Sequence, residues 1–166
     1  SIDTSKSPFE IKTLEGTIRS NSIIIATGAS ANRLGVINED KFWSKGISAC
    51  AICDGATPQF RDEELAVIGG GDSACEEAAY LTKYGSKVHL LVRSEKLRAS
   101  AAMIDRVKAN SKIEIHWNTK VEKANGTDWL ENVETINSQK GNVEIKVKGL
   151  FYAIGHTPNT NILNNR

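Results

Sequence analysis

The feature that most constrains the fold is a glycine-rich turn between an apolar segment and an amphipathic one. Residues 65–68 are uniformly apolar, as in a buried strand, and the turn Gly69-x-Gly71-x-x-Ala74 follows them directly. Apolar positions then recur at helical spacing over residues 73–84. A strand, this turn and a helix in that order predict the phosphate-binding corner of a βαβ unit.

Each small residue of the turn has a physical reason to be small. Gly69 permits the tight turn, Gly71 lets a pyrophosphate approach the backbone, and Ala74 allows close packing of helix against strand. The start of the helix offers free N–H groups to the anion. A packing turn without a ligand is the alternative, but the flanking strand and helix favour dinucleotide binding.

The next strand indicates which nucleotide the turn binds. A strand is predicted over residues 87–92, and Arg93 and Arg98 follow where an NAD site usually has Asp or Glu. Two guanidinium groups at a strand end suit a 2′-phosphate through charge-assisted contacts. Solvated surface arginines are the alternative, and the pattern favours NADP(H).

The remaining pattern predicts an α/β fold, a Rossmann-like three-layer domain with two kinds of sheet. A helix over residues 100–109 and a strand over 113–117 continue the strand–helix alternation, which implies a parallel sheet. The apolar period then becomes two, and three short strands predict an antiparallel β-meander. Residues 149–155 are one more buried strand. The first 29 residues predict a β-hairpin followed by a buried strand at residues 22–25.

Two of the three cysteines, Cys50 and Cys53, are separated by two residues, and Asp54 follows them. An odd number of cysteines without a secretion signal does not indicate a stabilising disulfide framework. Thiols at this spacing can close an exposed disulfide that exchanges readily, and a neighbouring carboxyl can act as a general acid–base. The alternatives are a zinc site, a structural pair and, for Asp54, a plain turn.

No metal site is expected from these cysteines. Structural zinc usually takes four ligands, commonly from a second such pair. Beyond Cys50 and Cys53 the chain offers Cys75, which lies on the apolar face of the predicted helix and is interpreted as a buried small hydrophobe. It also offers three scattered histidines: His89, His116 and His156.

Charge and hydropathy exclude several classes of partner. The 166 residues carry 21 Lys and Arg against 20 Asp and Glu, a net charge of +1. No large field of one sign is therefore available to bind nucleic acid or an anionic membrane surface. The apolar runs are far shorter than the ~20 residues of a spanning helix, and the N-terminus shows no signal-peptide core. We expect no nucleic-acid partner, no membrane partner and no secretion.

Four ordered motifs resemble those of low-molecular-weight NADPH-dependent thioredoxin reductases. They occupy residues 50–55, 67–74, 88–93 with Arg98, and 149–159. Two further segments, residues 42–49 and 80–84, are most similar to the chloroplast and cyanobacterial branch, in which the reductase is often fused to its own thioredoxin domain. The resemblance covers nearly the whole chain.

This resemblance implies an electron path from NADPH to FAD, then to a Cys50–Cys53 disulfide and finally to thioredoxin or a fused thioredoxin domain. Cys53 would face the flavin, Cys50 would attack the thioredoxin disulfide, and Asp54 would be the acid–base residue. The NADPH domain of this family rotates relative to its FAD domain, and the intact enzyme is expected to be a homodimer.

The motifs also imply which residues lie at the cofactors. Glu76 complements the helix dipole and is expected at the nicotinamide end. Ser94 stands where the family commonly has a basic residue, and this difference predicts modestly weaker NADPH binding. The residues expected beside FAD are Thr27, Gly28 and Ala29. The residues expected at NADPH are Gly69, Gly70, Gly71, Asp72, Ser73, Ala74, Glu76, Arg93, Arg98, Ile154 and Gly155.

The resemblance divides the chain into three parts. Residues 1–29 would end the first segment of an FAD-binding domain, residues 30–154 would form the NADPH-binding domain that carries the cysteines, and residues 155–166 would return toward a second FAD segment. The other FAD-binding motifs of the family are not in the sequence. We therefore expect a part of a longer enzyme that binds NADPH but is inactive alone without its FAD domain.

Two alternatives stay open. The reductase subunit of a peroxiredoxin system shares these motifs. In the second alternative, a stand-alone NADP-binding module would use Cys50 and Cys53 to sense the thiol–disulfide redox balance without catalysing electron transfer. All three hypotheses place the chain in a reducing compartment, the cytoplasm or the chloroplast stroma.

Overall fold

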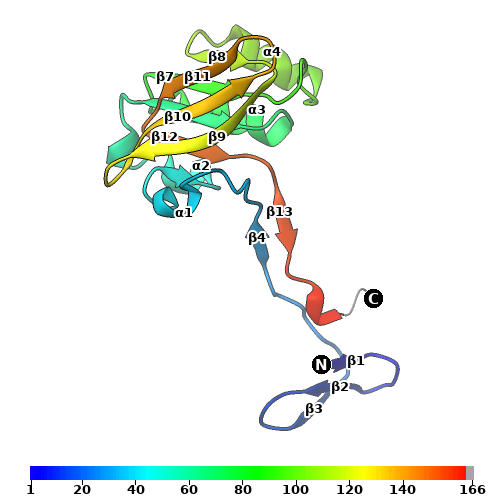
Figure 1. Ribbon diagram of the computed structural model, residues 1–166. Coiled ribbons are helices and arrows are strands. Elements are labelled where there is room, and N and C mark those ends of the chain that lie inside the picture. Colours follow the sequence, from blue (N-terminus) through cyan, green and yellow to red (C-terminus); the bar gives the residue numbers. More distant parts are fainter. Residues whose placement is uncertain (164–166) are drawn as a thin grey trace. The chain divides into compact units, whose positions relative to one another are not determined.

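The computed structural model describes residues 1–163, and the chain divides into two compact units (Figure 1). The larger unit is Asn32–Gly155, and the smaller one joins Ser1–Ala31 to His156–Arg166. No helix in the described part of the chain is long and apolar enough to cross a membrane. Each unit has sheets of its own, and the two are described separately.

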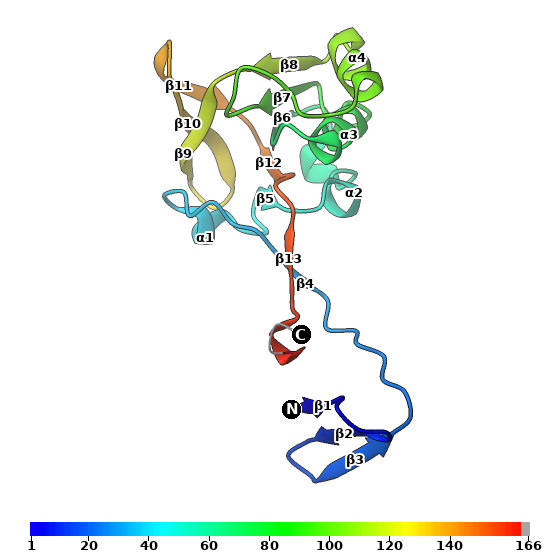
Figure 2. The same ribbon diagram turned by 90° about the vertical axis from the view of Figure 1, so that its right-hand side faces the viewer.

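The larger unit is built on a parallel sheet, for which the described residues supply five strands in the order β5-β12-β6-β7-β8. Figure 2 shows α2 (Ala51–Asp54), α3 (Asp72–Leu81) and α4 (Ala101–Ala109) on one side of this sheet and an antiparallel sheet, in the order β11-β10-β9, on the other. The predicted α/β fold, with its parallel sheet and antiparallel meander, is confirmed. The strands are β5 (Ile47–Ser48), β6 (Glu64–Ile68), β7 (Lys87–Leu91), β8 (Ile113–His116), β9 (Thr119–Gly126), β10 (Leu130–Asn137), β11 (Gly141–Lys146) and β12 (Gly149–Tyr152).

The helices follow the strands that they cover. The two longer ones are α3 (Asp72–Leu81), which follows β6, and α4 (Ala101–Ala109), which follows β7. Shorter turns of helix occur at α1 (Glu39–Phe42), α2 (Ala51–Asp54) and the 3-10 segment η1 (Pro58–Phe60). Of these, α2 begins directly after Cys50 and contains Cys53, the two predicted redox cysteines.

The central strands are apolar over most of their length because both of their faces are covered. On β6, Leu65 and Val67 pack into the cluster on the helical side, whereas Ala66 and Ile68 pack on the side of the meander. Alternate residues of a strand point to opposite faces, so a strand with two buried faces needs an unbroken apolar run. His89 on β7 is an exception, since it is polar and only 4% exposed.

The described residues of the smaller unit form two short antiparallel sheets. The strands β2 (Phe9–Lys12) and β3 (Thr17–Ser20) form a hairpin, and β1 (Ile2–Asp3) pairs with β2. Farther along, β4 (Ala29–Ala31) pairs with β13 (His156–Pro158), and the 3-10 segment η2 (Asn161–Leu163) follows.

One sequence-based expectation in the smaller unit is wrong. The buried strand predicted at residues 22–25 is irregular, and it forms no ladder with any described residue. Ile24 is 93% exposed and Ile25 46%. An apolar run becomes a buried strand only where other strands pair with its edges and other layers cover its faces. Those partners are missing among the described residues, so apolar character alone does not produce the strand.

Candidate functional site

A cleft of about 790 Å³ opens in the larger unit beside the carboxyl ends of β6, β7 and β12. The crevice outside the carboxyl ends of parallel strands is the usual binding place for nucleotides. Nine of the residues predicted at NADPH line it: Gly69, Gly70, Gly71, Asp72, Ser73, Arg93, Arg98, Ile154 and Gly155. Ala74 and Glu76 do not line it; Ala74 is fully buried and Glu76 is exposed.

The glycines of the turn differ in what they do. Gly69 has a φ of 149°, and a β-carbon built there would lie 2.6 Å from the carbonyl oxygen of Ala153 and 2.7 Å from the β-carbon of Ala74. Gly69 and Ala74 are therefore small because β6, β12 and α3 meet at this point. At Gly71 a β-carbon would meet nothing within 4 Å, so this position faces open space. The geometry fits an anion that approaches the backbone at Gly71.

Asp72 ties the start of α3 to the start of α4. One of its carboxylate oxygens accepts hydrogen bonds from the backbone N–H of Ser100 at 2.9 Å and from the Ser100 hydroxyl at 2.8 Å. These two bonds lower the pKa of Asp72. The loop is further closed by Arg98, whose backbone N–H donates to the Gly70 carbonyl at 2.6 Å. The carboxylate that we expected at the pyrophosphate or ribose is thus engaged by a neighbouring loop.

The two arginines that point to a 2′-phosphate are available to a ligand. Arg93 and Arg98 are exposed and line the cleft. Within residues 1–163, no hydrogen bond or ion pair engages either guanidinium group. Ser94, also at the cleft, donates its hydroxyl to the Lys96 carbonyl at 2.9 Å. Two unpaired guanidinium groups at one edge of a cleft suit a doubly charged phosphate.

Cys50 and Cys53 form a disulfide at the start of α2. The backbone N–H of Cys53 donates to the sulfur of Cys50 at 3.1 Å, so the sulfur caps the short helix. Cys53 is exposed and Ile52 is 65% exposed, whereas Ala51 is buried. Cys75, the third cysteine, is fully buried in the helical-side core, which confirms its interpretation as a small hydrophobe.

A serine that sequence analysis missed connects the disulfide to its neighbouring carboxyl. The hydroxyl of Ser48 donates to Asp54 at 2.6 Å and accepts the backbone N–H of Cys50 at 3.0 Å. Ser48 is 8% exposed, so its position is set by the surrounding core. Its two partners lie two and six residues farther along the chain, so the signal that could have identified this serine is its position just before the cysteine pair.

Glu77 on α3 is a second missed residue. It accepts a hydrogen bond from the backbone N–H of Ala51, at the start of the helix that carries the cysteines. Its Oε2 atom is buried without a hydrogen-bond partner among the described residues. Burial raises the pKa of Glu77 to about 7; the Ala51 hydrogen bond opposes this rise, and the charge of Glu76 adds to it. Glu77 therefore links α3 to α2 through a carboxyl that titrates near neutrality.

The residues expected beside FAD lie in the smaller unit. The carbonyls of Thr27 and Gly28 accept hydrogen bonds from Asn159, at 3.1 Å from its side chain and 3.0 Å from its backbone. Ala29 pairs with Pro158 in the β4–β13 ladder. This turn is thus held by the returning segment of the same unit.

Comparison with known proteins decides the family. The model described as pyridine nucleotide-disulphide oxidoreductase matches residues 1–166. The chain belongs to the pyridine nucleotide-disulphide oxidoreductase family. In this oxidoreductase family, a nucleotide cleft and a disulfide in one chain are expected together, and the larger unit contains both.

The chain is similar to proteins named thioredoxin reductase. It is 52% identical to the one from Debaryomyces hansenii, over 96% of this chain and 52% of that protein. Identity to NADPH-dependent thioredoxin reductase 3 of Arabidopsis thaliana is 48%, over 98% of this chain and 31% of the relative. A solved thioredoxin reductase from Giardia duodenalis is 41% identical with a TM-score of 0.87, over 96% of this chain and 52% of that one. The chain thus spans about half the length of the Debaryomyces and Giardia proteins and about a third of the Arabidopsis protein.

Substituting two glycines of the turn, one at a time, distinguishes a role in packing from a role in nucleotide binding. Gly71→Ala should change the free energy of unfolding by no more than about 0.5 kcal/mol, as for a substitution into open space, and should weaken NADPH binding more than tenfold. Gly69→Ala should destabilise the fold by ~1–3 kcal/mol through overpacking and strain. Urea unfolding and calorimetric titration with NADPH measure the two effects. Equal NADPH affinity for Gly71→Ala and the wild type would contradict the expected approach of the anion.

The raised pKa of Glu77 predicts a pH dependence of stability. A carboxyl whose pKa is 4.5 when unfolded and about 7 when folded stabilises the fold fully below the lower value. That contribution is lost as the pH rises through about 7. Glu77→Gln should therefore flatten the decline in the free energy of unfolding over this window, measured by urea unfolding at successive pH values. Glu76→Gln, at the exposed neighbour, is the control and should keep most of the decline.

Proposed function

We propose that this chain is the NADPH-binding and redox-disulfide part of a flavoprotein thioredoxin-disulfide reductase. The observation that carries the proposal is the occurrence, in one unit, of a nucleotide-sized cleft with two unengaged arginines and of a disulfide followed by Asp54. The names of the similar proteins support it. In the intact enzyme, electrons would pass from NADPH through FAD to the disulfide and on to thioredoxin.

The chain's own residues would bind and orient the nucleotide. Gly71 leaves room for the pyrophosphate, and the start of α3 presents backbone N–H groups to it. Arg93 and Arg98 would hold the 2′-phosphate, while Ile154 and Gly155 would flank the nucleotide on the side of β12. When bound, NADPH supplies a hydride, and FAD converts it to the electron pair that the disulfide needs.

The sulfur chemistry needs two electrons and two protons. Reduction breaks the Cys50–Cys53 bond and gives two thiols. The thiolate of Cys50 then attacks the thioredoxin disulfide and forms a mixed disulfide, which Cys53 resolves by closing the original bond and releasing thioredoxin as a dithiol. The Asp54 carboxylate accepts a hydrogen bond from the Ser48 hydroxyl at 2.6 Å. Asp54 would donate a proton to a leaving thiolate or accept one from an attacking thiol.

Finer assignments rest on the same resemblance. We propose Thr27, Gly28 and Ala29 as FAD-adjacent residues of the intact enzyme, a homodimer as its assembly, and thioredoxin, free or fused, as its partner. Membership in the chloroplast and cyanobacterial branch is supported only by residues 42–49 and 80–84. A reducing compartment, the cytoplasm or the chloroplast stroma, fits the exchangeable disulfide.

Replacing one arginine tests the choice of nucleotide. Arg93→Ala removes a charge-assisted contact worth ~1.5–3 kcal/mol, so NADPH should bind about 10- to 100-fold more weakly. NADH lacks the 2′-phosphate, and its affinity should not change. Arg106→Ala, on the exposed side of α4, is the matched control. Calorimetric titration with both nucleotides measures the effect, and an equal loss for NADH and NADPH would contradict a 2′-phosphate site.

Reduction of protein disulfides by the product of the full natural reading frame tests the activity. We expect NADPH-dependent reduction of thioredoxin, with the rate of Cys50→Ser lowered to background because the attacking thiol is lost. Cys75→Ser, at the buried third cysteine, is the control and should keep the rate of a correctly folded enzyme. Reduction of a peroxiredoxin but not of thioredoxin would favour the peroxiredoxin alternative. A natural reading frame that ends near residues 1 and 166 would favour the sensing module.

A further inference from the structure

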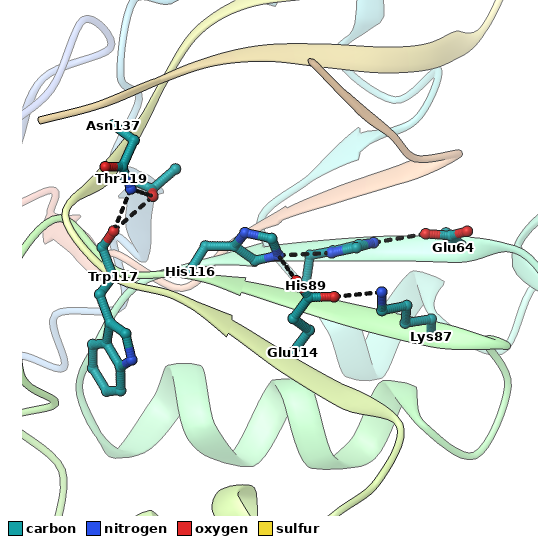
Figure 3. Close-up of polar contacts among 8 residues, drawn as sticks. All are labelled: Glu64, Lys87, His89, Glu114, His116, Trp117, Thr119 and Asn137. Atoms are coloured by element: carbon teal, nitrogen blue, oxygen red, sulfur yellow. Dashed lines mark hydrogen bonds and ion pairs between the residues drawn. The ribbon is translucent and has the colours of Figure 1, made fainter. Parts of the chain in front are cut away.

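A polar cluster lies between the two sheets of the larger unit, away from the cysteines and the arginines. It consists of His89 on β7 with Glu114 and His116 on β8 (Figure 3). Figure 3 shows the two imidazole rings directed toward each other, with Glu64 beyond the His89 ring and Glu114 close to where the two rings meet. Sequence analysis regards these histidines as scattered, since 26 residues separate them.

The parallel register explains why these residues converge. His89 lies opposite Glu114, and the next pair on the same face places Leu91 opposite His116. Leu91 is part of the core cluster on the side of the meander, so the cluster faces that antiparallel sheet. His89 is 4% exposed, whereas the side chain of Glu114 is 48% exposed and that of His116 20%. The cluster is therefore rooted in the core and open to solvent at one side.

The candidate ligand atoms have the spacing of a small metal site. Nδ1 of His89 lies 2.9 Å from Nε2 of His116, which in turn lies 3.5 Å from Oε1 of Glu114. One ligand atom from each residue falls within a common span of 4.8 Å. Around a tetrahedral zinc ion with bonds of ~2.0–2.1 Å, neighbouring ligand atoms lie about 3.3–3.4 Å apart. The two rings therefore need to separate by only about 0.5 Å to admit an ion.

Glu64 orients one of the rings. Nε2 of His89 lies 2.7 Å from Oε2 of Glu64, on the neighbouring strand β6. Because the carboxylate accepts a hydrogen bond from the Nε2–H group, the lone pair of His89 is left on Nδ1, which faces His116. A histidine held by a carboxylate at its far nitrogen is the usual arrangement at protein-bound metals.

The charged groups around the cluster leave Oε1 of Glu114 available to bind a metal ion. The Lys87 ammonium pairs with Oε2 of Glu114 and lowers the pKa of that carboxyl, while Oε1 is turned toward His116. Burial lowers the pKa of His116, helped by the charges of His89, Lys87 and Lys140 and opposed by Glu114. A neutral imidazole and an ionised carboxylate are the forms that bind metals.

The end of β8 is held in place independently. Asn137 on β10 donates to the Trp117 carbonyl at 2.7 Å and to the Thr119 hydroxyl at 3.0 Å (Figure 3). The Thr119 hydroxyl donates to the same carbonyl at 2.8 Å. These bonds anchor the turn that follows His116, so the ring is presented from a rigid strand end.

We propose that His89, His116 and Glu114 form a binding site for a divalent transition-metal ion of the zinc class, with Glu64 as the residue that orients His89. Two imidazole nitrogens, one carboxylate oxygen and a water molecule complete four-coordination. A bound ion would link β7 to β8 on the side of the meander. The proposal is independent of the proposed reductase function.

Titration of the disulfide-closed protein with zinc chloride tests this site. We expect saturable binding of one ion per chain, a higher Tm in the presence of zinc, and the visible absorption of four-coordinate Co²⁺ when cobalt is the probe. Acidification should release the ion because protons compete for the imidazoles. Absence of saturable binding to the folded wild type would overturn the proposal.

Variants locate the ion. Glu114→Gln and His116→Gln should each weaken zinc binding by at least about tenfold, and Glu64→Gln by about 10- to 100-fold, as for other outer partners of metal-bound histidines. Glu134→Gln is the matched control, since that side chain has the same 48% exposure and also pairs with a lysine; its affinity should stay within about twofold. Unchanged affinity in folded Glu114→Gln and His116→Gln, or a thiolate charge-transfer band with Co²⁺, would overturn the assignment.

Discussion

The close approach of three backbone segments at Gly69 determines the rest of the larger unit. There β6 ends, α3 is about to begin, and the end of β12 passes so near that a single added β-carbon would lie 2.6 Å from the Ala153 carbonyl. This contact brings the last strand of the parallel sheet beside the glycine turn. The cleft exists because the two segments diverge immediately beyond that point, at Gly71 on one side and at Ile154 and Gly155 on the other.

Helix α3 connects the two chemical parts of the unit. Its first residues line the nucleotide cleft, and Glu77, in its second turn, holds the backbone of Ala51 at the start of the cysteine helix. Ser48 holds both ends of the same helix, through Cys50 before its first residue and through Asp54 at its last. Cys53 is thus exposed, whereas the helix that carries it is anchored through buried polar groups, which gives a reactive bond a defined position.

Local patterns predict the frame of this protein well. The glycine turn, the apolar strands and the change of period from the helical to the strand value identify the α/β fold, and Gly69 to Ser73 lie at the cleft as expected. What cannot be predicted is set by contacts between distant segments. Glu77 and the His89–His116 pair have no local signature, because each depends on the register or packing of another element. The strand expected at residues 22–25 is wrong for the same reason, since pairing partners and not apolarity make a strand.

The strand order of the parallel sheet has a consequence for how the chain is made. The strand β12, at Gly149–Tyr152, lies between β5 at Ile47–Ser48 and β6 at Glu64–Ile68. During synthesis, β5 leaves the ribosome about 100 residues and β6 about 80 residues before the strand that joins them, and each exposes an unsatisfied edge until then. The meander of β9 to β11 is complete before β12 emerges. The central sheet therefore closes late, around a strand contributed by the last quarter of the unit, and the nucleotide cleft can form only after that closure.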